Sequence, residues 1–150
     1  METEASIKAV IRELMDTRGL AVLSTEGGGQ PYGSLVAFTG SDDLKHMTFA
    51  TPRSTRKFAN IEANPRVALL VNSSENTVDD YHRAACFTAT GSAVEIGSDD
   101  IGEDRDNYLS RHPYLKSFVD APTTALVRVT VDCYHVVHNF QTVTELHVNQ

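Results

Sequence analysis

The sequence contains no tryptophan, only two cysteines and no long apolar run. Without a run of about 18 apolar residues, a membrane-spanning helix is excluded on length. Cys86 and Cys133 lie in strand-like apolar stretches without C-x-x-C spacing, which predicts buried free thiols. The N-terminus lacks the basic and then apolar segments of a signal peptide, and we therefore expect a cytoplasmic protein.

Positive charge is also scarce, with 13 Lys and Arg against 20 Asp and Glu and a formal net charge of -7. This balance disfavours a general nucleic-acid binder, because such proteins use an excess of Lys and Arg to neutralise phosphates. Hydrophobic residues make up 41% and charged residues 22%, which is ordinary globular composition. A chain of 150 residues is the size of one domain, so we expect a single domain over residues 1–150.

The most informative stretch is HMTFATPRSTRKFANIEANPRVALLVN, residues 46–72. Its side-chain period changes from about 2 to about 3.6 near Ser54, which indicates a strand that turns into a helix. Ser54 or Thr55 suits the N-cap, and Asn64 before proline favours the helix end. The predicted elements are a strand over 46–51, a helix over about 55–63 and a strand over 66–72.

Three basic residues, Arg53, Arg56 and Lys57, gather at the start of this predicted helix. The N-terminus of a helix already carries the positive end of the helix dipole, so cations there are unfavourable unless an anion is bound. A phosphate would accept charge-assisted hydrogen bonds from these side chains and from the first backbone amides. The sequence thus predicts either a phosphate site or a solvated basic turn.

The rest of the chain reads as further strands with two more helices. A Gly-rich turn, EGGGQP, joins two strands into a hairpin, and Gly91 predicts a bulge where a sheet curls into a barrel. The total of about seven strands favours a closed or split barrel over a parallel α/β sheet. The predicted helices span 4–18 and about 99–112, and the predicted strands span 20–25, 32–39, 84–96, 123–139 and 142–148.

Two separated segments resemble one family in the right order and at the right spacing. The motif TxxSTRK followed by N-x-x-x-N-P, with QPYGSLVAF upstream, is similar to the flavin-binding core of the pyridoxamine 5'-phosphate oxidase-like proteins. The likeness covers roughly residues 17 to 96. It implies a mainly β fold, a Greek-key-like split β-barrel of the FMN-binding type with flanking helices. It also implies a homodimer with FMN at the seam between the two chains.

The resemblance also assigns residues to the FMN site, taken position by position. One strand runs under the flavin, a second strand end contacts the ring and the ribityl chain, and a basic pair holds the phosphate. The hydroxyl before that pair serves the helix as its cap or serves the phosphate. The strand under the flavin corresponds to Ser34, Leu35 and Val36, and the second strand end to Ala50 and Thr51. The basic pair corresponds to Arg56 and Lys57, and the hydroxyl before it to Thr55.

No catalytic side chain is assigned, because no Ser-His-Asp order or nucleophile elbow is present. His135 and His138 lie three apart in a predicted strand and so point to opposite faces, and no metal site is predicted. A flavin would supply the redox chemistry itself. We therefore expect an FMN-dependent oxidoreductase acting on a small molecule. The alternatives are a non-catalytic protein that binds haem, deazaflavin or a phosphorylated metabolite in the same groove, and a structural dimer whose basic turn is solvated.

Two departures from the family enzymes argue against oxidation of pyridoxamine 5'-phosphate itself. Those enzymes use a late tryptophan and a C-terminal segment with arginine and histidine, whereas this chain has no Trp and ends HNFQTVTELHVNQ. In addition, Ser34 stands where the family enzymes have an arginine in QPY-x-R. The sequence thus predicts a member that does not turn over the B6 substrate.

Overall fold

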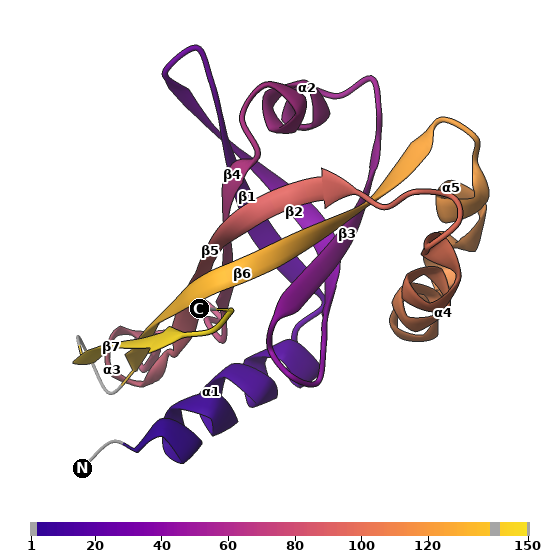
Figure 1. Cartoon of the computed structure of the whole chain (residues 1–150). Coiled ribbons are helices and arrows are strands. Elements are labelled where there is room, and N and C mark those ends of the chain that lie inside the picture. The colour runs from indigo at the N-terminus through magenta and orange to yellow at the C-terminus, as the bar shows by residue number, and fades with distance from the viewer. Residues whose placement is uncertain (1–2, 139–141, 150) are drawn as a thin grey trace.

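The computed structural model describes residues 3–138 and 142–149. Within them the chain is mainly β (Figure 1). The strands are β1 (Leu20–Gly27), β2 (Gln30–Gly40), β3 (His46–Pro52), β4 (Arg66–Asn72), β5 (Cys86–Glu95), β6 (Thr124–His138) and β7 (Thr142–His147). The helices are α1 (Glu4–Thr17), α2 (Arg56–Ala63), α3 (Asp80–Arg83), α4 (Ile101–Arg111), the 3-10 turn η1 (Pro113–Leu115) and α5 (Lys116–Asp120).

Six of these strands close an antiparallel barrel. The sheet order is β3-β2-β1-β4-β5-β6-β7, and a further pairing of β3 with β6 joins the two sides. Strand β7 extends the edge of β6 beyond the closed part. Strands β1, β2 and β3 form a meander that includes the predicted hairpin, whereas β4 returns to pair with β1 on its other side. The predicted split-barrel fold with flanking helices is confirmed.

Three glycines lie at a turn and at a bulge of this barrel. Gly28 and Gly29 adopt positive φ angles of 57° and 85° and form the two-residue turn between β1 and β2. At Gly91 the register between β5 and β6 shifts, and a Cβ there would lie 2.1 Å from the carbonyl oxygen of Thr130. The predicted bulge at Gly91 is therefore present, and only glycine fits the close approach of the two backbones.

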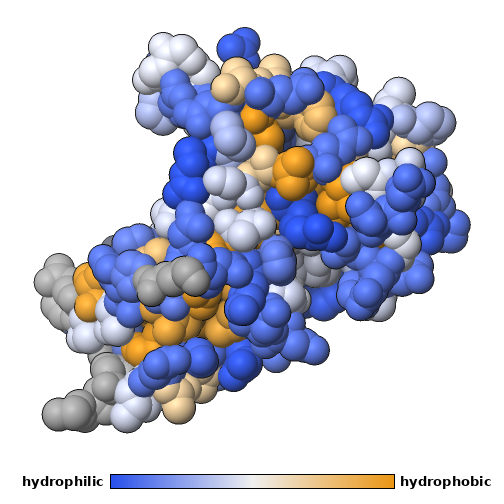
Figure 2. Space-filling model, in the orientation of Figure 1, coloured by the Kyte–Doolittle hydropathy of each residue, from blue (hydrophilic) through white to orange (hydrophobic). Residues whose placement is uncertain are grey.

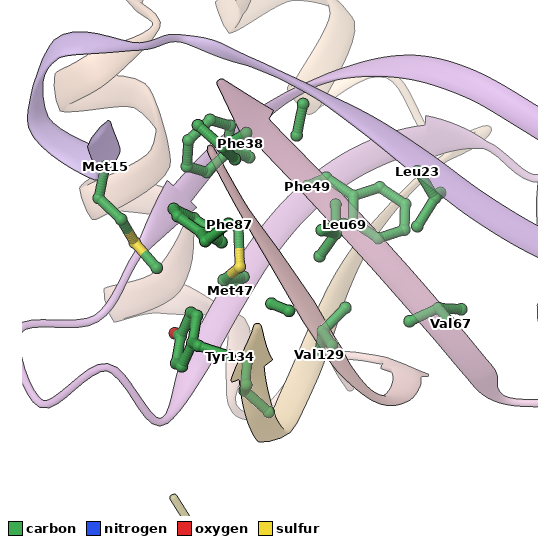
Figure 3. Packing of buried hydrophobic residues seen from close by; sticks show 14 of the residues in the cluster. Met15, Leu23, Phe38, Met47, Phe49, Val67, Leu69, Phe87, Val129 and Tyr134 are labelled. Carbon is green, nitrogen blue, oxygen red and sulfur yellow. The ribbon is translucent and has the colours of Figure 1, made fainter. Parts of the chain in front are cut away.

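The barrel interior is filled by aliphatic and aromatic side chains from every one of the six strands (Figure 3). Phe38, Phe49 and Phe87 are fully buried there, and the ring of Phe87 meets Tyr134 edge-on at a centroid distance of 5.3 Å. The amphipathic α1 covers one end of this core with its buried residues Ile7, Ile11, Leu14 and Met15. No described helix is long and apolar enough to cross a membrane.

A second, smaller apolar cluster lies outside the barrel, beneath α4 and α5. Ala50 of β3, Ile96, Leu126 and Tyr108 are its buried members, and Leu115 and Phe118 pack against it. The apolar residues after α4 thus pack the helical segment against the outside of the barrel. Helix α4 begins at Ile101, two residues later than the acidic run suggested, and the polar segment after β4 contains the short α3.

Candidate functional site

Strands β2 and β3 pair over only a short length. Their ladder runs from Gly40 opposite Met47 to Phe38 opposite Phe49, and no described pairing continues it. Beyond that point β2 stays paired with β1 and β3 stays paired with β6. We use the name seam for the stretch in which residues 33–37 of β2 and residues 50–52 of β3 are not paired with each other. It is the place where the barrel is split.

The phenol of Tyr108, from α4, occupies the closed end of the seam. Its hydroxyl donates to the carbonyl oxygen of Ala37 over 2.8 Å and accepts from the backbone N–H of Ala50. These two residues would be the next opposed pair of the ladder, so the hydroxyl takes the place of one strand-to-strand hydrogen bond. Burial raises the pKa of Tyr108 to about 12, so the phenol stays protonated and can donate.

The backbone of Leu35 faces the seam. In an antiparallel strand the N–H and C=O of one residue point to the same side, and that side alternates along the strand. Because the Ala37 carbonyl faces β3, the polar backbone groups of Leu35 face the same way. The side chain of Leu35 is 64% exposed on the outer surface, whereas Val36 is buried in the barrel. The backbone N–H and C=O of Leu35 therefore face the seam, where no described strand pairs with them.

Helix α2 begins directly after β3, at the open end of the seam. Thr55 is its N-cap and accepts from the backbone N–H of Phe58 over 3.3 Å. The Thr55 hydroxyl donates to the Pro52 carbonyl oxygen at 2.9 Å, and the hydroxyl of the buried Thr51 lies 3.0 Å from it. The hydrogen of the Thr55 hydroxyl is thus used inside the turn. The cap role of Thr55 is thus present in the structure.

The basic cluster at the helix start divides into one engaged and two free side chains. The guanidinium of Arg53 pairs with the Glu95 carboxylate at 2.6 Å and donates to the Pro122 carbonyl oxygen at 2.8 Å. This ion pair raises the pKa of Arg53 and joins the ends of β3 and β5. Among the described residues, no hydrogen bond or ion pair involves the side chain of Arg56 or Lys57. Of the three basic residues, Arg56 and Lys57 are therefore the two whose side chains have no partner in the described part of the chain.

The two backbone amides of Arg56 and Lys57 also lack helical partners. The first helical hydrogen bond runs from Ala59 to Thr55, and Phe58 is satisfied by the cap, so the two preceding N–H groups have no acceptor within the helix. The start of α2 thus presents two amides and two cationic side chains together. This set of donors matches what an anion at a helix N-terminus requires.

The structure brings the eight sequence-predicted site residues around one seam, in three groups. Leu35 and Val36 belong to its β2 side, and Ala50 and Thr51 to its β3 side. Ser34 lies further along β2, and its buried hydroxyl oxygen has no hydrogen-bond partner in the described part of the chain. The remaining residues, Thr55, Arg56 and Lys57, lie at the start of α2. Among the α2 residues, only Arg56 and Lys57 present uncommitted cationic groups.

Tyr108 was not found by the sequence reasoning, because nothing in α4 signals a partner on β2. The two basic residues after it, Arg111 and His112, are also engaged. Arg111 donates to the carbonyl oxygens of Met15 and, at 3.0 Å, Arg18, and the His112 Nε2 lies 2.8 Å from the Phe38 carbonyl oxygen. They anchor α4 to α1 and β2, so neither is available to a substrate phosphate.

Comparison with solved structures gives the same fold. A haem-binding protein from Mycobacterium smegmatis aligns with a TM-score of 0.84 at 16% identity, over 98% of this chain and 59% of its own. General Stress Protein 26 from Bacillus anthracis aligns with a TM-score of 0.71 at 19% identity, over 95% of this chain and 98% of its own. An FAD-binding protein from Mesorhizobium loti aligns with a TM-score of 0.67 at 18% identity, over 86% and 89%.

These identities are low, so the likeness to solved structures shows the fold alone. The chain spans about three-fifths of the length of some of these neighbours, the haem-binding protein among them. No curated protein matches the sequence significantly. A family model described as pyridoxamine 5'-phosphate oxidase, however, matches residues 7–138. On that match, which takes in all six barrel strands, the seam and the start of α2, the chain belongs to the pyridoxamine 5'-phosphate oxidase family.

Proposed function

We propose that this protein binds FMN in the seam and is an FMN-dependent oxidoreductase acting on a small molecule. The observation that carries the proposal is the free donor set at the start of α2, placed at the open end of the seam. The family of the chain and a solved FAD-binding neighbour with the same fold support a flavin at this position.

The phosphate of FMN would lie at the start of α2. Two amides and the side chains of Arg56 and Lys57 together offer several charge-assisted hydrogen bonds, each contributing roughly 1.5 to 3 kcal/mol. Such bonds outweigh the unfavourable effect of two cations at the positive end of the helix dipole, which is about 0.3 to 1 kcal/mol each. The basic pair thus stabilises the protein best when an anion is bound.

The flavin ring would lie along the seam, where the backbone of Leu35 is free. Ring nitrogens and carbonyls of a flavin need donors and acceptors in one plane, and an unpaired strand edge supplies both. Ser34 lies on the same strand, and its buried hydroxyl has no hydrogen-bond partner in the described part of the chain. It is a further group to which a ligand could hydrogen-bond. When bound, a flavin supplies hydride or electron transfer, so the absence of an assigned catalytic dyad is compatible with an oxidoreductase.

A second candidate function is haem binding without catalysis. It is favoured by one observation, the solved haem-binding protein from Mycobacterium smegmatis that shares the fold. A haem would not need the phosphate donors at α2, whereas it would need an axial ligand near the seam. The two candidates differ in the visible spectrum of the loaded protein, since a haem gives a Soret band and a flavin gives its own pair of bands.

The direct experiment is to purify the protein, record its absorbance and titrate the colourless fraction with FMN, haem and deazaflavin. We expect FMN to bind with quenching of its fluorescence. Selective binding of haem, with no response to FMN, would contradict the proposal in favour of the second candidate. Selective binding of deazaflavin would contradict the choice of FMN as the cofactor. No binding of any of the three would leave a structural protein with a solvated basic turn.

Variants of the basic pair test the phosphate role. Arg56→Ala and Lys57→Ala should each weaken FMN binding by about 1.5 to 3 kcal/mol, because each removes a charge-assisted hydrogen bond. Neither should change the urea midpoint much, since neither side chain has a described partner. Arg12→Ala on α1 is the matched control, an exposed arginine far from the seam, and should leave FMN affinity unchanged. Equal FMN affinity in wild type and both variants would refute the phosphate role.

A further inference from the structure

Four side chains with metal-binding atoms share one face of the hairpin formed by β6 and β7. Cys133 and His135 are two apart on β6, and Glu145 and His147 are two apart on β7, so each pair lies on one face of its strand. The register places Cys133 opposite His147 and His135 opposite Glu145. Antiparallel pairing thus converts two short patterns, C-x-H and E-x-H, into a square of four neighbouring side chains.

The distances within this square are those of a nearly formed metal site. The Cys133 Sγ lies 3.9 Å from the His147 Nε2, and the His147 Nε2 lies 3.0 Å from the Glu145 Oε2. All three ligand atoms lie within 4.8 Å of one another. Zinc–ligand bonds of about 2.0 to 2.3 Å at tetrahedral angles require ligand atoms about 3.3 to 3.6 Å apart. Small side-chain rotations would bring the three groups to those separations.

His135 is held on the far side of the carboxylate. Its Nδ1 lies 3.6 Å from the Glu145 Oε1, while the other carboxylate oxygen faces His147. A histidine in this position acts on the carboxylate and not on the metal, as the outer partners of metal ligands commonly do. The square therefore divides into three ligands and one positioning residue.

We propose that Cys133, Glu145 and His147 bind a zinc ion, with His135 positioning the Glu145 carboxylate. One sulfur, one nitrogen and one oxygen ligand form a donor set that suits zinc and not magnesium or calcium, which take oxygen ligands. The fourth position of the tetrahedron is left to water or to a ligand.

The surroundings provide access for that fourth ligand. A groove of about 310 Å³ lies beside the two exposed ligands and is lined by Thr3, Glu4 and Ile7 of the N-terminal segment as well as by Thr144 to His147 of β7. Cys133 is buried, whereas Glu145 and His147 are exposed towards solvent. An open coordination position with an entry path is the arrangement of zinc sites that bind small ligands, not of closed structural ones.

The zinc site is independent of the flavin proposal. The hairpin end that carries it and helix α2 lie at opposite ends of the molecule (Figure 1). None of its residues lines the seam. No metal site is predicted from local sequence, because His138, the other histidine of β6, points to the opposite face of the strand from His135. The relevant pairing is across the hairpin and is fixed by the register of β6 and β7.

The test is zinc binding by the metal-free full-length protein, measured in competition with a chromogenic chelator. We expect one equivalent per chain, and with cobalt as a probe we expect a thiolate-to-cobalt charge-transfer band. Cys133→Ser and His147→Ala should each weaken zinc binding by about a hundredfold, because each removes one ligand. His135→Ala should weaken it by about tenfold, and His135→Gln, which keeps a donor to the carboxylate, should restore part of that loss.

Cys86→Ser is the matched control, since Cys86 is the other free cysteine and lies outside the square. It should keep the zinc affinity of the wild type and the charge-transfer band. His147 is half exposed, so His147→Ala tests the site even where Cys133→Ser disturbs packing. The proposal is overturned by a failure of the wild type to bind zinc, or by unchanged affinity in His147→Ala, or by loss of the cobalt band in Cys86→Ser alone.

Discussion

At the scale of single residues, the barrel is held open by hydrogen bonds that replace strand pairing. Tyr108 satisfies one acceptor on β2 and one donor on β3 at the closed end of the seam. Arg53, which follows β3, instead joins the end of that strand to Glu95 of β5 and to the Pro122 carbonyl oxygen before β6. Both side chains come to their partners from distant parts of the sequence. The hydrogen bonds of Tyr108 therefore stabilise β2 and β3 at the point where their direct pairing ends.

The hydroxyl of Tyr108 should contribute measurably to stability. Tyr108→Phe removes the partner of the Ala37 carbonyl and of the Ala50 N–H in a site where Tyr108 is only 1% exposed. Leaving buried groups unsatisfied costs about 1 to 3 kcal/mol, so we expect the free energy of unfolding in urea to fall by that amount. Tyr114→Phe is the control, because Tyr114 is 97% exposed and its change should stay within about 0.5 kcal/mol. Equal stability of wild type and Tyr108→Phe would show that the strands pair directly without the phenol.

At the scale of elements, the outer face of β1, β2 and β4 carries apolar residues where an isolated barrel would carry polar ones. Leu20 is 55% and Leu35 is 64% exposed, and the register sets Val22 between Leu35 and Leu70. On the face drawn in Figure 2, by contrast, apolar residues reach the surface in separate places with hydrophilic residues between them. Leu35, Val22 and Leu70 are cross-strand neighbours, and an exposed apolar strand face of this kind marks an interaction surface. It adjoins the seam through Leu35.

We expect this face to pair with its copy in a homodimer. Light scattering at micromolar concentration should give twice the 16.4 kDa of one chain. Leu35→Glu should shift the mass towards a single chain, because a charge would be buried at the centre of a self-complementary contact. Val78→Glu in the loop after β4 is the control, since Val78 is 79% exposed and lies off this face. A wild-type mass of one chain would exclude both the dimer and a flavin site shared between two chains.

At the scale of the whole molecule, positive charge is scarce and most of it is engaged. Arg53, Arg66, Arg105 and Arg128 form ion pairs, and Arg111 is held by backbone carbonyls. Residues 140–150 contain no Arg or Lys. Among the described residues, the adjacent cations that have no hydrogen-bond or ion-pair partner are Arg56 and Lys57 at the start of α2. A reaction that needs two phosphates held at once, one on the cofactor and one on the substrate, lacks the second clamp.

The FMN-loaded protein should accordingly not oxidise pyridoxamine 5'-phosphate at a useful rate. A misplacement of the reacting carbon by about 1 Å lowers the rate about a hundredfold, and residues 140–150 carry no Arg or Lys that could fix the substrate phosphate. Pyridoxal 5'-phosphate formation under air, with saturating FMN, should give a kcat/KM below about 10⁴ M⁻¹s⁻¹. Reduction by dithionite and reoxidation by air serve as the control that the flavin is bound and active. A kcat/KM at or above that value would overturn the expectation.

Most elements of this fold could be predicted from local sequence. The change of period near Ser54 gave the strand and helix on either side of the basic turn, Asn64 before Pro65 marked the helix end, and Gly91 marked the bulge. These signals are local, since they depend on side-chain period, φ preference and the effect of proline on its neighbour. The fold class followed from the number and length of the strands together with the family resemblance.

Tertiary structure alone decided which side chains are free and which are engaged. Sequence placed Arg53, Arg56 and Lys57 together, but only packing against β5 showed that Glu95 occupies Arg53. The sequence shows only that His135 and His138 are three residues apart in one strand. The pairing of β6 with β7 places His135 opposite Glu145 and Cys133 opposite His147. Both outcomes depend on contacts between segments far apart in the chain or on a strand register, and a local pattern contains neither. The sequence determined the elements and the chemical groups that they carry, and the closure of the barrel determined which of those groups meet.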